Sequence, residues 1–484
     1  MTPTLPCAGG LLQLAPDGAG PLREFRARFR RCLTARGDAL FSLCDAVLCA
    51  GGRVTDLARL SLVPEFGRGH GALYDCLNAG RADVRMLGRL MTSLRPPAWP
   101  DGRIRLAADV TCWLRPEAET SAGRLYCHVR GKGANPGWLV PGWQYSFVAA
   151  LGPGASSWAP LLDAVRLGPA DDAAAVAARQ LREVVARLIA AGHWKAGDPA
   201  ILIAVDSGYP AARLAWELRD LPVLLVARVR EDRVFRAPPP PRVPGAPGRA
   251  GRHGARLDCS APATWDEPDI TADAGSARLG PLLVMAWHRR HQRLTRQNLG
   301  WAGHQGQLPV IEGTVIRLAR AGGRELMWLW ASDPQAGPAL TTTLWQSYLR
   351  RFDLEHAFRF LKQQLGWTRP LLRSPQAADR WTWLLIAAWN QLWLARSLAA
   401  ITRLPWQRPQ PPAEMTPGRG RAGFRHARQI VGTPASTPKP ARPGPGRPKG
   451  SSNTTRAPRH PVGKTNPQTR SNDKKHRKNA NRTG

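Results

Sequence analysis

The sequence of 484 residues predicts an α/β fold with a mixed sheet at its core. Apolar and polar residues alternate in 104–108, 124–130 and 143–151, which is typical of half-buried strands. The continuous apolar runs 200–205 and 221–229 are typical of buried central strands. A helical period over 173–191 separates the two kinds of strand, and a short helix is expected between the apolar runs. The order of three strands, helix, strand, helix, strand predicts one sheet with helices packed on it.

Changes in composition divide the chain into six parts. A helical period dominates the first large part, and short β-like pieces dominate the part that interrupts the core. The last part carries eighteen Lys and Arg against two acids, +16 of the total charge, with few apolar residues, so it is predicted to be disordered. The expected parts are a flexible N-terminus (1–20), a helical domain (21–100), the first part of the core (101–229), a β-rich insertion (230–335), the C-terminal core helices (336–405) and a basic tail (406–484).

The formal net charge of +34 points to a polyanion as partner, most simply nucleic acid. A membrane surface explains the charge less well, because the N-terminus lacks the pattern of a secretory signal. The most apolar helical stretch, 381–401, contains Asn390, Gln391 and Arg396, which favours a buried helix over a membrane span. The eight cysteines are scattered without a close Cys-x-x-Cys pair, which predicts free thiols in a reducing cytosol.

Three basic regions have two interpretations each. Residues 21–94 contain helices around a glycine-rich turn, typical of a helix-turn-helix DNA reader, or of a purely structural helical subdomain. In the insertion, Arg and Trp are interleaved, and His288 and His291 fit a basic face against DNA better than a zinc site. In the tail, the segment around Arg447 resembles an AT-hook core, although a general electrostatic arm explains it more simply.

One helical stretch carries a carboxylate between two cations and a phenol. Tyr348, Arg351, Glu355 and Lys362 are three, four and seven positions apart, so they fall along one edge of a single helix. The carboxylate suits a divalent ion, and the cations and phenol suit phosphate oxygens. The alternative is an amphipathic helix whose charges form salt bridges at its solvated face.

Three acids can form a metal site with this helix. Asp109 ends the first predicted strand, Asp206 follows the first buried strand, and Glu355 lies on the late helix. If the two strands are adjacent, the aspartates lie side by side, and clustered carboxylates need a cation between them. Mg²⁺ suits such a site, because it binds a few carboxylates together with phosphate oxygens of a substrate.

With these residues in place, the chain resembles bacterial insertion-sequence transposases of the DDE class, whose catalytic core is RNase-H-like. The resemblance covers about residues 20–400. Its most specific part is the branch signature Tyr-x2-Arg-x3-Glu-x6-Lys, present without a gap at Tyr348, Arg351, Glu355 and Lys362.

Further segments extend the resemblance. Residues 109–113 resemble the segment of the first catalytic aspartate and 206–209 that of the second, and a β-rich insertion such as 230–335 is typical of this branch. The chain departs from the pattern at Pro210, where a polar residue is expected, and in the tail, which lies outside the resemblance.

The resemblance implies Mg²⁺-dependent DNA strand cleavage and transfer of the cut-and-paste type, with Mn²⁺ as a possible substitute. Asp109, Asp206 and Glu355 would bind the metal and catalyse the reaction. Tyr348, Arg351 and Lys362 would hold phosphates at the transposon end, and Arg447 would contact DNA from the tail. The implied partners are double-stranded DNA, both transposon end and target, and a second copy of the chain. The implied location is the bacterial cytoplasm at the nucleoid, without a membrane.

Two other classes of function remain open. A domesticated or decayed transposase would keep the fold and charge as a non-enzymatic DNA-binding protein, although all three acids and the full signature remain. An RNA-binding or architectural protein built around the tail would explain only the tail. The inverted repeats, the target sequence and a hairpin intermediate cannot be derived from the sequence.

Overall fold

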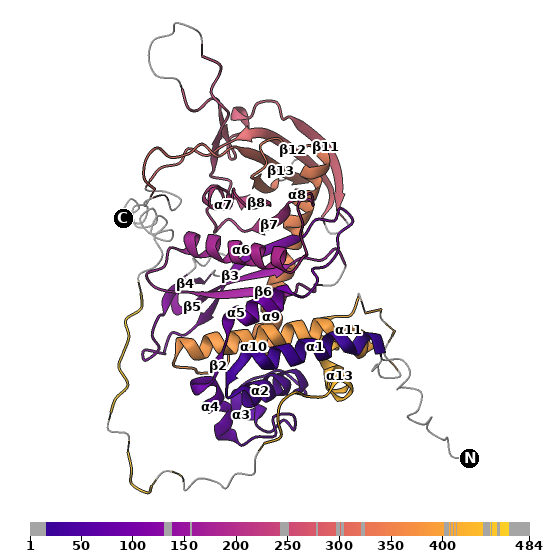
Figure 1. Ribbon diagram of the computed structural model, residues 1–484. Coiled ribbons are helices and arrows are strands. Elements are labelled where there is room, and N and C mark those ends of the chain that lie inside the picture. Colours follow the sequence, from indigo (N-terminus) through magenta and orange to yellow (C-terminus); the bar gives the residue numbers. More distant parts are fainter. Residues whose placement is uncertain are drawn as a thin grey trace, which may run out of the picture.

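A computed structural model shows the predicted α/β fold, with a large mixed sheet and a layer of helices beneath it (Figure 1). The structure describes residues 16–129, 138–154, 157–242, 251–276, 279–296, 301, 304–320, 325–400, 406, 408–409, 411–412, 414–438, 446, 448–452 and 455–463.

The centre of the sheet has the order β6-β5-β3-β7-β8. β5 is antiparallel to both β3 and β6, whereas β3, β7 and β8 run parallel to one another. Three antiparallel strands followed by two parallel ones form the RNase-H-like arrangement that the resemblance implies, so the predicted fold class is confirmed. The strands are β3 (Arg105–Leu114), β4 (Leu125–Val129), β5 (Trp138–Ala150), β6 (Leu161–Leu167), β7 (Ile201–Val205) and β8 (Val223–Val229).

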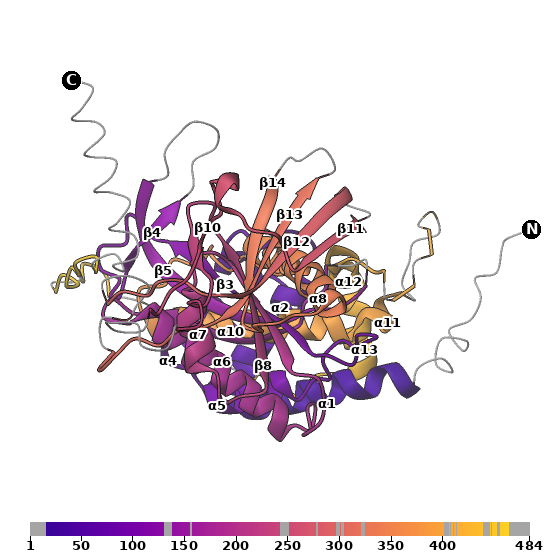
Figure 2. The same ribbon diagram turned by 90° about the horizontal axis from the view of Figure 1, so that it is seen from above.

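Four strands of the predicted insertion continue this same sheet, and two short ones form a separate two-stranded sheet. β14 pairs with β8, and β13, β12 and β11 follow outward in antiparallel order, as Figure 2 shows from above. The insertion is thus hydrogen-bonded to the core where residues 328–331 of β14 pair with residues 226–229 of β8. Its strands are β9 (Val234–Arg236), β10 (Arg256–Asp258), β11 (Ile270–Ser276), β12 (Gly280–Arg290), β13 (Gly313–Arg320) and β14 (Glu325–Ala331).

Helices cover both faces of the sheet. α6 (Ala173–Ala190) and α7 (Ala211–Glu217) pack on one face, over an apolar cluster that includes Val205 and Ala227. α8 (Pro338–Arg350), α9 (Phe352–Gln363) and α10 (Pro375–Leu394) pack on the other. Because side chains alternate along a strand, the central strands β3, β5, β7 and β8 contribute to apolar clusters on both faces.

A second layer of helices joins the two ends of the chain. The N-terminal helices share one apolar core with α10, which runs alongside α1 in Figure 1. Trp381, Trp383 and Trp389 of α10 are buried in this core, as predicted for a core helix, and the partly buried Trp393 packs against it. The N-terminal elements are α1 (Pro16–Cys32), β1 (Leu33–Ala35), α2 (Gly37–Cys49), α3 (Leu57–Leu60), α4 (His70–Ala79), β2 (Arg81–Ala82) and α5 (Val84–Thr92).

The C-terminal part differs from the expectation of a structureless tail beginning at residue 406. α12 (Pro417–Ala422) and α13 (Phe424–Val431) are formed, and Phe424, Ala427 and Val431 are buried in the helical core. A few apolar residues at helical spacing suffice here, since α13 packs against α1 and α2. The α11 helix (Arg396–Ala400) precedes them. Residues 464–484 lie outside the described residues.

A buried ion network ties α1, α2, α10 and α13 together. Asp45 is 1% exposed and accepts hydrogen bonds from both Nη atoms of Arg26, at 2.8 and 2.9 Å, and from Nε of Arg428 at 2.8 Å. Arg26 also donates to Oε1 of Gln391 at 2.6 Å. A buried carboxylate with two guanidinium partners is compensated, so this network fixes how the four helices meet.

Two further expectations need correction. β6 was not predicted as a strand, because its buried Asp163 interrupts the apolar pattern, and this carboxylate is neutralised by Arg187. β11 was missed, because only Ile270 in it is strongly apolar and buried. None of the helices in the described part of the chain is long and apolar enough to cross a membrane.

Asp45→Ala is expected to lower the free energy of unfolding by about 3–5 kcal/mol, because two arginines lose their buried counter-ion. Urea denaturation followed by tryptophan fluorescence measures this change. The matched control is Asp75→Ala, since Asp75 pairs with Arg36 at 2.8 Å while 42% exposed, and its loss should cost at most about 1 kcal/mol. Equal costs for both variants would contradict the network's role.

Truncation after residue 438 should lower the free energy of unfolding by at most about 2 kcal/mol, because it removes the hydrogen bonds of His460 and Gly463 with Glu119 and Arg124. Truncation after residue 405 should lower it by about 3–6 kcal/mol, because Phe424 and Val431 lose their burial and Asp45 loses Arg428. The two truncated proteins are compared by thermal and urea unfolding. If both unfold like the full chain, α12 and α13 do not contribute to the core.

Candidate active site

Asp109 and Asp206 occupy neighbouring positions on adjacent parallel strands. β3 pairs with β7 in a register that ends at Ala108 opposite Val205, so the two aspartates follow directly, on strands about 4.8 Å apart. The prediction that Asp109 ends its strand is wrong. Asp109 lies within β3, beside the position where β7 ends. Both side chains project from the face that α8 and α9 cover, since their neighbours two positions back lie in the clusters on that face.

The signature residues lie on two helices rather than one. α8 ends at Arg350 and α9 begins at Phe352, with Arg351 at the junction. The backbone of Arg351 remains helical, but the hydrogen bonds here run from Arg351 to Tyr348 and from Leu354 to Arg351, one residue shorter than in an α-helix. This tighter turn separates α8 from α9 at the residue that enters the acidic cluster.

Arg351 bridges two of the three predicted catalytic acids. Its Nη1 lies 2.5 Å from Oδ2 of Asp109, and its Nη2 lies 2.8 Å from Oε1 of Glu355. The Arg351 side chain is 8% exposed, Asp109 17% and Glu355 38%. The guanidinium therefore provides the positive charge that the clustered carboxylates require.

Tyr348 holds the third acid. Its hydroxyl donates to Oδ1 of Asp206 at 3.1 Å, and the guanidinium of Arg351 lies 5.6 Å from the Tyr348 ring centre. Burial, together with the charge of Asp206, raises the pKa of Tyr348 above its ordinary value, against the effect of Arg351 and Arg228. The phenol thus stays protonated and remains a hydrogen-bond donor.

Lys362 and Trp367 continue the contacts along β3. Lys362 Nζ donates to Oγ1 of Thr111 at 2.6 Å, and the ring of Trp367 packs at 5.9 Å from that of Trp113. Residues 109, 111 and 113 all project from the same face of β3. Arg351, Lys362 and Trp367 contact them in this order, so α9 and the residues after it run along the strand. Burial lowers the pKa of Lys362.

Burial also raises the pKa of Asp109 to about 6, above its ordinary value of 3.8. Arg351 opposes this rise, while the negative charges of Asp206 and Glu355 add to it. Burial works against the charge of Arg351 as well, yet Asp109 and the other acidic groups around it raise the pKa of this guanidinium. These shifts show that the three acids interact with one another and with one cation.

The donor set of Asp109, Asp206 and Glu355 fits Mg²⁺, which prefers carboxylate oxygens. In the structure, however, the guanidinium of Arg351 lies between Asp109 and Glu355 and contacts both carboxylates. Within the described ranges, no group of three or more His, Cys, Asp or Glu side chains could hold a metal ion as they stand. A divalent ion between Asp109 and Glu355 would have to take the place of the guanidinium.

Six of the seven predicted site residues come together. Arg447 lies outside the described residues, so its contact with DNA stays a prediction. Sequence reasoning missed Thr111, the partner of Lys362, although the strand period of two from Asp109 marks this position. It also missed Arg228, which stands beside Asp206 once β7 and β8 are aligned, because only the pairing of Val205 with Ala227 reveals it.

Comparison with known proteins gives one family. A family model described as DDE superfamily endonuclease matches residues 28–294, more than half of the chain. The matched range contains Asp109 and Asp206 and ends before Glu355. No curated protein matches the chain.

Arg351→Gln should lower the free energy of unfolding in EDTA by about 3 kcal/mol at about pH 8, because the three carboxylates lose their cation. The pKa of Asp109 in the folded protein, about 6, exceeds its ordinary value, so ionisation of this carboxyl opposes folding as the pH rises. Loss of the guanidinium strengthens that effect. The cost is therefore smaller at about pH 5, where Asp109 is protonated.

The measurement is urea unfolding at both pH values. Arg182→Gln is the matched control, because Arg182 and its partner Asp220 are 41% and 59% exposed, and its loss should cost at most about 1 kcal/mol at either pH. A cost for Arg351→Gln that does not depend on pH would show that the guanidinium does not balance the acids.

Proposed function

Because the chain belongs to the DDE superfamily endonucleases, we propose that it is a DNA transposase that cuts and transfers the strands of an insertion sequence by a cut-and-paste route. The branch with the Tyr-x2-Arg-x3-Glu-x6-Lys signature is the proposed origin within the superfamily. The observation that carries the proposal is the gathering of Asp109, Asp206 and Glu355 around Arg351.

The support comes from three separate regions of the chain. Asp109 belongs to a strand, Asp206 to the end of another strand, and Glu355 to a helix almost 150 residues later. Structural carboxylates are normally paired one by one with cations, as Asp163 is with Arg187. Here Asp109 and Glu355 share one cation, Arg351, whose side chain is 8% exposed. Such a partly buried cluster of like charges lowers stability and is typical of functional sites.

In the proposed reaction, water attacks a phosphorus atom of the DNA backbone, the bond to the 3′ oxygen breaks, and a 3′-hydroxyl is released. That hydroxyl then attacks a phosphodiester of the target strand and displaces its 3′ oxygen. Asp109, Asp206 and Glu355 would hold Mg²⁺, with Mn²⁺ as a substitute. Bound Mg²⁺ would lower the pKa of the attacking hydroxyl and stabilise the leaving oxygen.

The signature side chains have two tasks in this proposal. Before metal binds, Arg351 neutralises Asp109 and Glu355, and Tyr348 orients Asp206. If Asp109 and Glu355 held a divalent ion instead of the guanidinium, Arg351 would become available for a phosphate oxygen next to the cleaved bond. Lys362 would contribute a second cation from the same helix, released from Thr111.

The proposed partners are double-stranded DNA at the transposon ends and the target, bridged by a homodimer in the bacterial nucleoid. The competing proposal is a transposase-derived protein that binds DNA without cutting it. Both explain the net charge of +34 and differ in whether the acidic cluster cleaves DNA. An assay of strand cleavage therefore decides between them.

Glu355→Gln is expected to reduce nicking of supercoiled plasmid in Mg²⁺ by about 100-fold or more, because the amide removes a metal ligand while keeping the side-chain shape. EDTA should abolish nicking by the wild type. Conversion of supercoiled to open-circular plasmid is followed on agarose gels.

The control is Glu183→Gln, an exposed glutamate on α6, which should nick like the wild type. Circular dichroism and plasmid binding in EDTA are measured for all proteins, to show that they fold and bind DNA. A folded Glu355→Gln protein with wild-type nicking would overturn the enzymatic proposal. A wild type that binds plasmid but never nicks it would favour the non-enzymatic one.

A further inference from the structure

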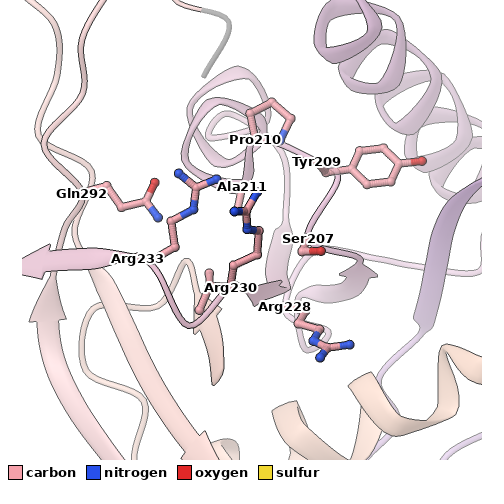
Figure 3. A pocket seen from close by; sticks show the side chains of 9 residues that line it. Ser207, Tyr209, Pro210, Ala211, Arg228, Arg230, Arg233 and Gln292 are labelled. Atoms are coloured by element: carbon pink, nitrogen blue, oxygen red, sulfur yellow. The ribbon is translucent and has the colours of Figure 1, made fainter. Parts of the chain in front are cut away.

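A shallow arginine-lined pocket opens next to the acidic cluster. It begins at Ser207, the residue after Asp206, and is lined further out by Arg228, Arg230, Arg233 and Gln292 (Figure 3). These residues come from the turn after β7, from the end of β8 with the turn that follows it, and from the segment after β12. The pocket therefore joins the core of the sheet to its extension.

Among the arginines of the pocket, Arg228 is the one that the strand register places beside the acids. β7 and β8 pair in parallel up to Val205 opposite Ala227, so Arg228 occupies the position beside Asp206. Its neighbour two positions back, Val226, packs in the same cluster as Tyr348, and Arg228 influences the pKa of Tyr348. Arg228 therefore projects from the face of the sheet from which α8 and α9 contribute their site residues.

Arg228 is a pocket cation without a carboxylate partner among the residues that the structure describes, and it is exposed. Arg351, by contrast, is held by Asp109 and Glu355. Arg228 is thus a cation at the acidic cluster that can accept an anionic ligand without first giving up a protein partner.

The outer part of the pocket is partly balanced. Arg230 lies 2.5 Å from Asp232, and Arg233 lies 4.0 Å from the same carboxylate, with both arginines and Asp232 at least a third exposed. Glu231 lies in the same turn. Exposed pairs of this kind are weak and exchange readily for a phosphate. Figure 3 shows Arg230 and Arg233 side by side near Pro210, with Gln292 facing them.

We propose that this pocket binds the phosphodiester backbone of the DNA strand being cut, with Arg228 on the phosphate closest to the scissile bond and Arg233 further along. The inference rests on the proposed function and adds the path of the strand, from the acids across the end of β8 toward the sheet extension. An extended backbone with a charge at each nucleotide fits an open row of arginines better than a compact anion, which would need an enclosed site.

The test compares Arg228→Gln/Arg233→Gln with a control of equal charge change, Arg179→Gln/Lys195→Gln. Arg179 lies on α6 and Lys195 after it, and both are exposed with no side-chain partner within the described part of the chain. Affinity for a labelled random-sequence duplex is measured by fluorescence anisotropy in EDTA, from about 50 to about 300 mM NaCl. Plasmid nicking in Mg²⁺ is measured in parallel.

The pocket variant should bind at least about 10-fold more weakly and lose about 2 units of the slope of log K against log salt, because each lost phosphate contact removes about 0.9. The control should lose less than about 0.5 units. A pocket variant that matches its control in affinity, slope and nicking overturns the inference, even if the wild type nicks DNA. If the wild type does not nick but the pocket variant still loses affinity, the transposase proposal fails and the binding path stands.

Discussion

Arg351, the cation shared by Asp109 and Glu355, is the constraint around which the candidate active site is built. Asp109, Asp206 and Glu355 cannot remain ionised close together without positive charge between them, and the guanidinium provides it at contact distance. This interaction also fixes the covering helices, because Arg351 stands where α8 ends and α9 begins. The path of α9 along β3, through Lys362 and Thr111, follows from this anchor.

The sequence predicted the elements of the core well, because their signals are local. The apolar run before Asp206 specifies a buried strand, and the helical spacing from Tyr348 to Lys362 specifies the face that these residues share. The break between α8 and α9 at Arg351 leaves no such signal in the spacing. The neighbouring positions of Asp109 and Asp206 also follow, once the strand order of the RNase-H-like fold is assumed. The proposed roles of these residues remain for the nicking assay to decide.

The features that were missed depend on contacts between distant residues. No local pattern shows that Arg351 bridges two acids, or that Arg228 stands beside Asp206, because both result from strand pairing and helix packing. The strand containing Asp163 was missed because its carboxylate is neutralised by Arg187 of a helix that follows in the chain. Likewise, α13 has a composition typical of a disordered tail and becomes ordered only through the core that it joins.

The ion network of Asp45 has a consequence for folding during synthesis on the ribosome. Its first partner, Arg26, is synthesised before it, but its second, Arg428, is separated from it by 383 positions. At ordinary rates of translation the ribosome needs roughly 20–80 s to cover that distance. During this interval the first helices have left the ribosome with their apolar faces exposed to water. Chaperones are therefore expected to bind the nascent chain. Truncated mRNAs would give products with the same exposed faces, which proteases can recognise.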